Sequence, residues 1–528
     1  MRPPFCIKSI IVYNGGNMTA KKDYSAEQII KFFSEKDSKW WEKEGQARAL
    51  ALFHDAAVRV PAYKDFLKKN KINHTKITTW EDFQSVPLTS KKDYLKKYPL
   101  EQLCWDGNLN KPLVFTATSG STGEPFYFPR TEGVDKNAAI IHEFFLLNNT
   151  YNTKKPTLVI VAFGMGIWIG GLITYKAFEI AAQRAGYPVS IITPGLNKKE
   201  VLNALEKIAP NYGQVILAGY PPMVKDIIDE GIAQGIDFKK LNMRLVTAAE
   251  AYTENFRDYL IEKTGIKNLF HDVMSIYGSA DIGAMAFETP TAILMRRLAM
   301  RKRELFENIF SEIKKTPTLV QYNPLQILFE APKGEVVLTG DSAIPLIRYA
   351  IGDNGGVAGY DALVGRVEKE GIDWGKEVKK AKIGSTQKLP FVYVYERNDF
   401  STTLYGLQIY PETIREALLK DCLNNHVTGK FSMATSFDGE QNQYLEINIE
   451  LKKGITVDKN GAVVCKEGEE DLMQTVTKEI TEFLKAKNAE FNELSKNLKE
   501  RATPKIVLWP AEHPTHFKPG TKQKWIQK

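Results

Sequence analysis

The decisive stretch of this sequence is LVFTATSGSTGEPFYFPR, residues 113–130. It joins an apolar run typical of a β-strand to a turn rich in Ser, Thr and Gly, and further β-like residues follow. Glycines let backbone amides approach phosphate oxygens, and hydroxyl groups add donors. The turn is not a Walker A loop, because the GxxxxGK[ST] spacing is absent and no lysine follows Gly123. Taken alone, it leaves a phosphate-binding loop and an ordinary turn between strands equally open.

More apolar runs follow this turn, and helical patterns alternate with them. The runs are TLVIVAF (157–163), PVSIIT (188–193), QVILAGY (214–220), MRLVTAA (243–249) and NLFHDVMSIYG (268–278). LQILFEA (325–331) and GEVVLTG (334–340) indicate strands of a later β-rich part. Such alternation predicts a large α/β domain with mixed, mostly parallel sheets flanked by helices.

One of these runs is long enough to require a membrane test. Residues 157–175, TLVIVAFGMGIWIGGLITY, carry no charge and would just span a bilayer. The stretch contains four glycines, and Lys176 and Glu179 continue its helical pattern. We therefore expect a buried strand over Thr157–Phe163, a Gly-Met-Gly turn and a helix, with no transmembrane segment.

The pattern changes after about residue 395. PETIREALLK (411–420) predicts a helix, FSMATSF (431–437), QYLEINIEL (443–451) and KIVLWP (505–510) predict strands, and a long polar helix is expected over roughly 469–500. We predict a large domain over 19–395 and a small α+β domain over 396–528. Residues 1–18 are expected to be a disordered or non-native extension, with Met18 as a hypothetical true start.

Composition excludes several classes of protein. The net charge of +8 is spread over 71 basic and 63 acidic residues without a long basic arm, so no nucleic-acid partner is expected. The four cysteines are scattered and form no CxxC pair, which favours a reducing cytoplasm over a disulfide framework and predicts no structural zinc. A basic segment over 295–315 is expected to be a solvated helix face; a coenzyme A phosphate site or an anionic membrane surface is the alternative.

Several segments, in this order, resemble motifs of the adenylate-forming superfamily, which includes acyl-CoA ligases and synthetase adenylation domains. They are TSGSTGEP (118–125), TAAEA (247–251), YGSAD (277–281), PLIRY (345–349) with Gly352 and Asp353, Arg397-Asn398-Asp399 with Gly406 and Pro411, and Lys522. VPAYKDFL (60–67), SVPLTSKKDYLKKYP (85–99) and TAAEAYTENFRDYL (247–260) look most like the phenylacetate–CoA ligase branch. The resemblance implies a large domain that binds ATP and the acid, and a mobile C-terminal lid domain.

The resemblance also implies a nucleotide site. The phosphate loop would consist of Thr118, Ser119, Gly120, Ser121, Thr122 and Gly123. The adenine would contact Ala249, Glu250, Tyr277, Gly278 and Ser279, with Tyr277 stacked on it. Asp353 would accept hydrogen bonds from the ribose hydroxyls, and Arg397 would reach the ribose or a phosphate. Asp281 stands where the family has Glu and would bind Mg²⁺.

The remaining implied positions concern catalysis and the acid. Lys522 would be the catalytic lysine that contacts the α-phosphate and the attacking carboxylate, with Lys524 as the alternative, and Asp399 would be the hinge. The acid pocket is expected at Phe163, Gly164, Gly166 and Trp168, although plain core packing explains the same residues nearly as well.

The resemblance thus implies a cytoplasmic, ATP-dependent ligase that converts an aromatic or aliphatic carboxylic acid to its acyl-AMP and transfers it to coenzyme A. Transfer to a protein, an amine or another acceptor is one alternative. A non-catalytic nucleotide-binding protein is another, since Asp281 departs from the family's Glu. A homodimer is one candidate assembly.

Overall fold

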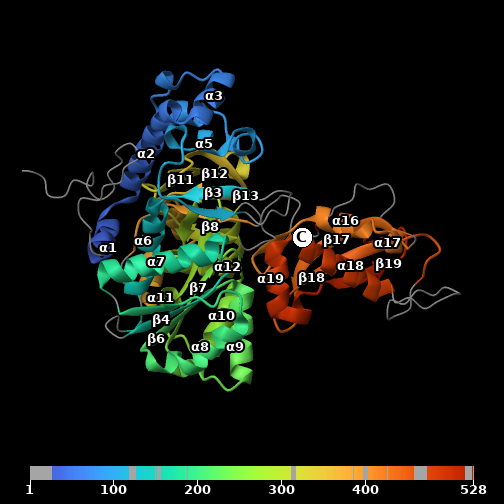
Figure 1. Ribbon diagram of the computed structural model, residues 1–528. Helices are drawn as coiled ribbons and strands as arrows, with labels where there is room; N and C mark the ends of the chain where they lie inside the picture. The colour runs from blue at the N-terminus through green and yellow to red at the C-terminus, as the bar shows by residue number, and fades with distance from the viewer. Residues whose placement is uncertain are drawn as a thin grey trace, which may run out of the picture.

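The computed structural model describes residues 26–117, 126–148, 150–151, 156–186, 188–310, 317–384, 386–395, 402–424, 426–456, 472–517 and 526. The described residues form a large part up to residue 395 and a smaller part from residue 402, which lies beside it (Figure 1). The expected extension 1–18 lies outside the described residues, and the expected boundary at 395/396 adjoins a segment that also lies outside them. Both therefore stay predictions.

The apolar runs of the sequence form the parallel half of a twelve-stranded sheet. Its parallel strands, in spatial order, are β5 (Val189–Ile192), β4 (Thr157–Ala162), β6 (Gln214–Gly219), β7 (Met243–Ala248) and β8 (Val273–Ser279). Every residue of β4 and β6 is buried, as expected for strands covered by helices on both faces.

The other half of the sheet is antiparallel. It continues through β9 (Gly283–Phe287), β10 (Thr318–Gln321), β14 (Phe391–Val394), β13 (Leu346–Ala358), β12 (Glu335–Gly340) and β11 (Ile327–Glu330). The short strand β1 (Thr89–Ser90) pairs with β13 in parallel. The run before the Ser/Gly turn does not join this sheet: β2 (Val114–Ala117) pairs only with β3 (Tyr127–Arg130) among the described strands.

Helices cover both faces of the sheet (Figure 1). The described helices of the large part are α1 (Ala26–Glu35), α2 (Ser38–Arg59), α3 (Pro61–Lys69), α4 (Trp80–Ser85), α5 (Leu100–Leu103), α6 (Glu132–Leu147), α7 (Ile169–Ala185), α8 (Lys198–Lys207), α9 (Pro221–Ala233), α10 (Glu254–Thr264), α11 (Leu269–Asp272), α12 (Pro290–Arg301), α13 (Arg303–Ile309), α14 (Tyr360–Lys369) and α15 (Trp374–Lys380). The uncharged stretch 157–175 divides into β4, a turn and the start of α7, as its glycines predict. No helix within the described ranges is long and apolar enough to cross a membrane.

The smaller part is an α+β unit. A hairpin of β15 (Thr402–Leu404) and β16 (Leu407–Ile409) precedes a sheet of β17 (Val427–Phe437), β18 (Gln443–Leu451) and β19 (Lys505–Trp509), packed with α16 (Pro411–Leu418), α17 (Asp421–Asn424), α18 (Leu472–Lys487) and α19 (Ala489–Leu498). The single polar helix expected over 469–500 is therefore two helices. Asn488 separates them, because its side chain accepts the Phe491 N–H at 2.9 Å and begins α19 as its N-cap.

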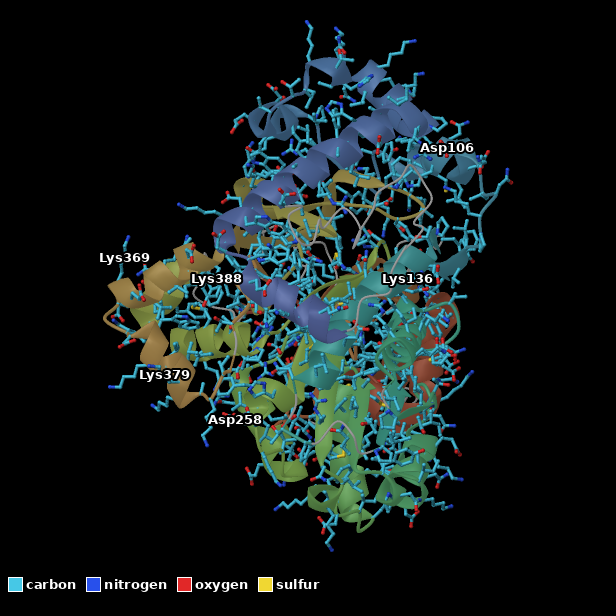
Figure 2. All side chains as sticks on the ribbon, turned by 90° about the vertical axis from the view of Figure 1, so that its left-hand side faces the viewer. Asp106, Lys136, Asp258, Lys369, Lys379 and Lys388 are labelled. Carbon is cyan, nitrogen blue, oxygen red and sulfur yellow. The ribbon has the colours of Figure 1, made fainter. Side chains whose placement is uncertain are left out.

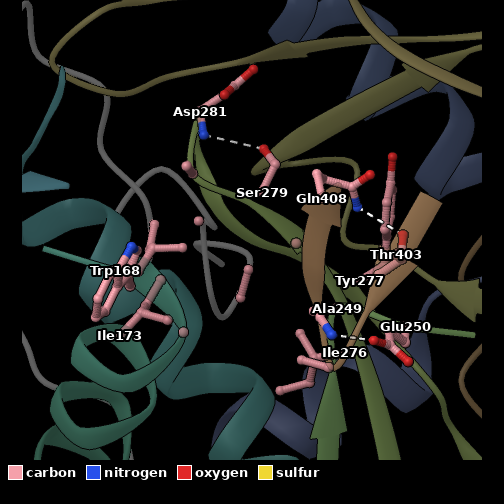
Figure 3. Close-up of a pocket in the computed structure, with 18 of the residues that line it drawn as sticks. Trp168, Ile173, Ala249, Glu250, Ile276, Tyr277, Ser279, Asp281, Thr403 and Gln408 are labelled. Atoms are coloured by element: carbon pink, nitrogen blue, oxygen red, sulfur yellow. Dashed lines mark hydrogen bonds between the residues drawn. The ribbon is translucent and has the colours of Figure 1, made fainter. Parts of the chain in front are cut away.

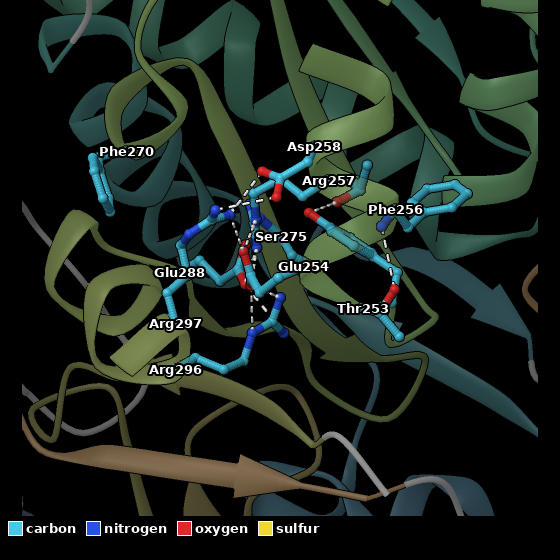
Figure 4. Close-up of polar contacts among 12 residues, drawn as sticks. Thr253, Glu254, Phe256, Arg257, Asp258, Phe270, Ser275, Glu288, Arg296 and Arg297 are labelled. Atoms are coloured by element: carbon cyan, nitrogen blue, oxygen red, sulfur yellow. Dashed lines mark hydrogen bonds and ion pairs between the residues drawn. The ribbon is translucent and has the colours of Figure 1, made fainter. Parts of the chain in front are cut away.

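Basic residues of the large part differ in their surroundings. Lys369, Lys379 and Lys388 gather at one edge, around α14 and α15, and extend outward (Figure 2). The expectation of a solvated face over 295–315 is wrong for Arg296 and Arg297. Arg296 is 2% exposed and binds Glu254 and Glu288, and Arg297 binds Glu254 as well (Figure 4).

The buried cluster of Glu254, Arg257, Glu288 and Arg296 connects α10, α12 and the end of β9. Glu254 lies at the start of α10, Arg257 one turn later, and Arg296 on α12, while Glu288 directly follows β9. Burial alone would raise the pKa of Glu254, but the surrounding guanidinium groups lower it to about 2, so the carboxylate stays charged. Glu288 also accepts the Ser275 N–H at 3.0 Å, and this hydrogen bond holds β8 against the buried cluster.

Candidate functional site

A cavity of about 340 Å³ lies at the carboxyl ends of the parallel strands. Phe163 directly follows β4, Tyr220 directly follows β6 and Ala249 directly follows β7, and all three line the cavity. Open α/β sheets bind ligands at this edge because the loops that leave the strands there are free to form a pocket. Figure 3 shows Trp168 and Ile173 on one side of the cavity and Tyr277, Thr403 and Gln408 on the other.

Most described members of the predicted site line this one cavity. They are Phe163, Trp168, Ala249, Glu250, Tyr277, Gly278, Ser279, Asp281 and Asp353. Several predicted residues fall outside the described part of the chain: Thr118, Ser119, Gly120, Ser121, Thr122, Gly123, Arg397, Asp399, Lys522 and its alternative Lys524. Their roles stay predictions.

A short hydrogen bond joins Tyr277 to Asp353 across the cavity wall. The Tyr277 hydroxyl donates to Asp353 Oδ2 at 2.5 Å, although the two residues come from β8 and β13. The Tyr277 ring is only half-buried, whereas Asp353 is 9% exposed. Gly278 has a packing requirement of its own, since a Cβ there would lie 2.7 Å from the Gly283 carbonyl oxygen.

Asp281 is a buried carboxylate with two partners. Its Oδ2 accepts the Tyr349 hydroxyl at 2.8 Å, and Lys91 Nζ lies 3.3 Å from its Oδ1. Both partners come from regions that pair at the β1–β13 junction, so the position of Asp281 depends on the packing of that junction. Within the described residues, no group of three or more His, Cys, Asp or Glu side chains could hold a metal ion.

The segment after β7 connects the cavity to the smaller part of the chain. Ala249 has a φ of +76°, a conformation that is costly for a residue with a Cβ. The next residue, Glu250, accepts the Gly406 N–H with one carboxylate oxygen and Gln443 Nε2, at 2.9 Å, with the other. The carboxylate of Glu250 is thus used for contacts with the smaller part.

The side of the cavity nearest α6 and α7 is mostly apolar. Phe163 and Trp168 line it, and a Cβ on Gly164 would meet the Trp168 ring at 3.2 Å. Of the four residues predicted for the acid pocket, Phe163 and Trp168 line the cavity, whereas Gly164 and Gly166 do not. Gly166 is exposed in the turn, with a φ of +85°. Gly171 allows α7 to begin against this turn, since its Cβ would be 2.4 Å from the Gly164 carbonyl oxygen.

A buried histidine also lies in this mostly apolar wall. His142, on α6, is 1% exposed, and its Nδ1 lies 2.8 Å from the Ala138 carbonyl oxygen. Its Nε2 has no hydrogen-bond partner within the described residues. Burial lowers the pKa of His142 to about 4, so the ring is neutral at physiological pH and Nε2 is an acceptor.

The smaller part closes the remaining side of the cavity. Its contribution consists of Thr403, Gly406, Gln408, Tyr410 and Glu490. Gly406, at the tip of the β15–β16 hairpin, has a φ of +81°, and a Cβ there would lie 2.6 Å from the Tyr220 ring. Only glycine therefore lets the hairpin approach Tyr220 this closely.

The sequence interpretation missed several residues of the wall. They are Lys91, His142, Tyr220 and Glu490; Tyr349, which donates to the wall residue Asp281, was missed as well. Lys91 and Tyr349 lie within segments that resemble family motifs, and Tyr220 ends a predicted strand. The sequence therefore indicated the segments that contain these residues but not the residues themselves. His142 and Glu490 stand in ordinary helical patterns that give no signal of a site.

Comparisons with known proteins find solved structures of similar fold but no protein of similar sequence. No protein-family model and no curated protein sequence matches this chain. A crystal structure of 2-hydroxyisobutyryl-CoA ligase, in complex with 2-HIB-AMP and CoA in the thioesterification state, aligns with a TM-score of 0.57 and 15% identity over 92% of this chain and 89% of that chain. An open conformation of the same ligase aligns with a TM-score of 0.48 and 15% identity, over 92% and 90% of the two chains.

The first of these likenesses confirms the fold class that the motifs imply. The alignment covers nearly all of both chains, so the likeness extends over the large part and the smaller part of this chain. At 15% identity the likeness concerns the fold, while the chemistry has to be argued from the cavity.

Proposed function

We propose that this protein activates a carboxylic acid with ATP, forming acyl-AMP and pyrophosphate, and then transfers the acyl group to coenzyme A. The observation that carries the proposal is the composition of one cavity. Tyr277, Asp281 and Asp353, which come from two separate motifs, line one wall, and the apolar residues Phe163 and Trp168 line another. A polar wall beside an apolar one suits a nucleotide next to an acyl group.

The nucleotide is assigned to the polar wall. Asp353 accepts the ribose hydroxyls, and the Tyr277 hydroxyl bound to its Oδ2 fixes the orientation of the carboxylate. The half-exposed Tyr277 ring stacks on the adenine. Because the Glu250 carboxylate is engaged by Gly406 and Gln443, we assign the adenine contact of residues 249–250 to their backbone.

Asp281 is the residue proposed to hold magnesium. Mg²⁺ takes one or two carboxylates and completes its shell with water and substrate phosphates, so a single buried Asp fits it. Lys91 Nζ lies 3.3 Å from Oδ1, and an ion bound directly to that oxygen would displace this contact. When bound, the ion would neutralise phosphate charge.

Residues outside the described part of the chain complete the proposal. Residues 118–123 hold the β- and γ-phosphates, Arg397 reaches the ribose or a phosphate, and Lys522 neutralises charge as the carboxylate attacks the α-phosphorus. Asp399 is proposed as the hinge of the small domain. The acid lies against Phe163 and Trp168, which suits an aromatic or aliphatic acid of the kind that the phenylacetate–CoA ligase branch takes.

Pyrophosphate exchange over a panel of aromatic, aliphatic and hydroxy acids tests the first half-reaction. We expect exchange of label from pyrophosphate into ATP that depends on one class of acid. Asp353→Ala and Lys522→Ala are expected to reduce it at least about 100-fold, as for loss of a charged transition-state contact. Asp237→Ala, which removes a surface carboxylate paired with Lys240, is the control and is expected to leave exchange unchanged. Absence of exchange with every acid would contradict the proposal.

A separate experiment tests which molecule accepts the acyl group. With the acid that supports exchange, products formed in the presence and absence of coenzyme A are compared by mass spectrometry. A thioester that forms only with coenzyme A supports the proposed transfer. Acyl-AMP that persists with coenzyme A, and reacts only with an amine or a carrier protein, assigns the enzyme to a different class of acceptor.

A further inference from the structure

Glu490 is a residue of the small domain that lies at the cavity of the large domain. It is the second residue of α19, and it is 8% exposed. Its Oε1 accepts the Tyr220 hydroxyl at 3.4 Å, and within the described residues this is its one hydrogen bond. Tyr220 in turn packs edge-on against Phe163, at 5.1 Å between ring centroids, so Glu490 lies beside the apolar wall.

The carboxyl group of Glu490 is unusual because, in the part of the chain that the structure describes, no lysine, arginine or histidine forms an ion pair with it. Glu250 accepts two donors from the small domain, and Glu254 is surrounded by three arginines. Among the described residues, the Glu490 carboxyl group has a single long hydrogen bond from the Tyr220 hydroxyl, and burial raises its pKa to about 7. A buried carboxyl without an ionic partner is costly for the fold, and such groups concentrate at functional sites.

The position of Glu490 depends on the arrangement of the two domains. Gly406 of the β15–β16 hairpin packs against the Tyr220 ring, and the Glu250 bonds to Gly406 and Gln443 hold the same face of the small domain. Glu490 therefore reaches the cavity together with this hairpin. Any chemical role of Glu490 is therefore limited to a reaction step that takes place in this arrangement of the domains.

We infer that Glu490 is the general base that deprotonates the attacking thiol in the transfer of the acyl group to coenzyme A. This inference rests on the proposed function and adds a residue to its second half-reaction. A Glu490 carboxylate oxygen takes the proton from the thiol S–H, and the sulfur electron pair forms a bond to the acyl carbonyl carbon. The bond between that carbon and the phosphate oxygen then breaks, and AMP leaves with its electron pair. The products are the thioester, AMP and protonated Glu490.

The ionisation of Glu490 suits this role. With a pKa of about 7, the group is substantially ionised at neutral pH, yet basic enough to accept a proton from a thiol in the transition state. A carboxylate with an ordinary pKa would be a weaker base. The small domain thus supplies a carboxyl group beside the apolar wall of the cavity.

Glu490→Gln tests the inference, because it keeps the size of the side chain and removes the base. We expect acid-dependent pyrophosphate exchange within about twofold of the wild type, while single-turnover thioester formation from acyl-AMP falls about 100-fold or more. Hydroxylamine is the decisive second acceptor, since its nitrogen lone pair attacks without prior loss of a proton. Hydroxamate formation by Glu490→Gln is expected to stay close to the wild-type rate.

Glu493→Gln is the matched control, since Glu493 lies on the same helix and pairs with Lys496 at the surface. It is expected to leave both acceptors unaffected. An equal loss with coenzyme A and with hydroxylamine would show that Glu490 is structural, and an unchanged thioester rate would show that it is not needed; either result overturns the inference. A wild-type protein without pyrophosphate exchange would instead contradict the proposed function.

Discussion

At the scale of single residues, the bond between Tyr277 and Asp353 gives the most direct test of the nucleotide wall. Tyr277→Phe keeps the ring but removes the hydroxyl that donates to Asp353 Oδ2 at 2.5 Å. The carboxylate then loses a fixed orientation, at a net cost of about 1 kcal/mol, so we expect the KM for ATP to rise about fivefold while kcat changes less.

The ATP dependence of pyrophosphate exchange provides both constants. Tyr444→Phe is the control, because Tyr444 is equally half-buried but lies on β18, away from the cavity. If the KM for ATP is unchanged in both Tyr277→Phe and Asp353→Ala, the ribose is bound elsewhere.

His142 predicts a dependence of stability on pH. Its pKa is about 4 in the folded protein and about 6.5 in the unfolded chain, so only the unfolded chain takes up a proton between these values. The free energy of unfolding therefore falls as pH decreases through this window, by about 2 kcal/mol between about pH 7.5 and pH 5 for this residue.

Urea unfolding of the wild type and His142→Gln at these two pH values isolates the contribution, because all other titrating groups are common to both proteins. We expect the variant to lose less stability on acidification by this amount. Equal losses in the two proteins would mean that His142 is protonated as readily when folded as when unfolded.

At the scale of elements, the buried ion cluster determines how α10 and α12 are held against β8. Glu288 has both oxygens engaged, with Arg257 Nη2 at 2.7 Å and the Ser275 N–H at 3.0 Å. Glu288→Gln leaves buried guanidinium charge without its partner, and we expect it to lower the free energy of unfolding by about 3–5 kcal/mol.

Glu307→Gln is the matched control for this loss. Glu307 pairs with Arg303 at the surface of α13, where solvent screens the charges and an ion pair contributes little to stability. Urea unfolding measures both variants. A similar, small loss in both would show that the buried cluster is not needed for stability.

The sequence could predict the buried strands of the fold but not this ion cluster. Strands β4, β6 and β7 follow from continuous apolar runs, because a strand buried on both faces needs apolar residues at every position. The burial of Arg296 and the ion pairs of Arg297 could not be predicted, since their partners Glu254 and Asp258 lie 42 and 39 residues away in the chain. Periodicity reports only neighbours within a helix.

The candidate site likewise contains residues that the sequence could predict and residues that it could not. Tyr277, Asp281 and Asp353 were found because each lies in a motif whose order along the chain is informative, and the fold brings them to one cavity. His142 and Glu490 could not be found, because a single polar residue in a helix is usually solvated, and only the packing of other elements around them makes them part of a wall.

At the scale of the whole molecule, contacts between the domains hold the arrangement in which Glu490 reaches the cavity. Asp226 on α9 is 2% exposed, and it accepts the Tyr405 hydroxyl at 2.9 Å and forms an ion pair with Arg501. Lys225 donates to Asn442 at 2.9 Å beside this pair. Burial raises the pKa of Asp226 and the Arg501 guanidinium opposes that rise, so the buried carboxylate relies on a partner from the other domain.

Arg501→Ala removes that partner without touching the cavity. The Arg501 side chain is 44% exposed, so we expect a moderate cost of about 1–2 kcal/mol to this arrangement of the domains, which is about a tenfold shift toward other arrangements. Thioester formation is expected to slow about tenfold while pyrophosphate exchange is retained, and small-angle scattering is expected to show a larger radius of gyration. Lys496→Ala, which removes a surface cation of the same domain, is the control. Equal slowing of both half-reactions would contradict the inference that Glu490 acts in the transfer step from this arrangement, because a contact specific to one arrangement cannot affect both alike.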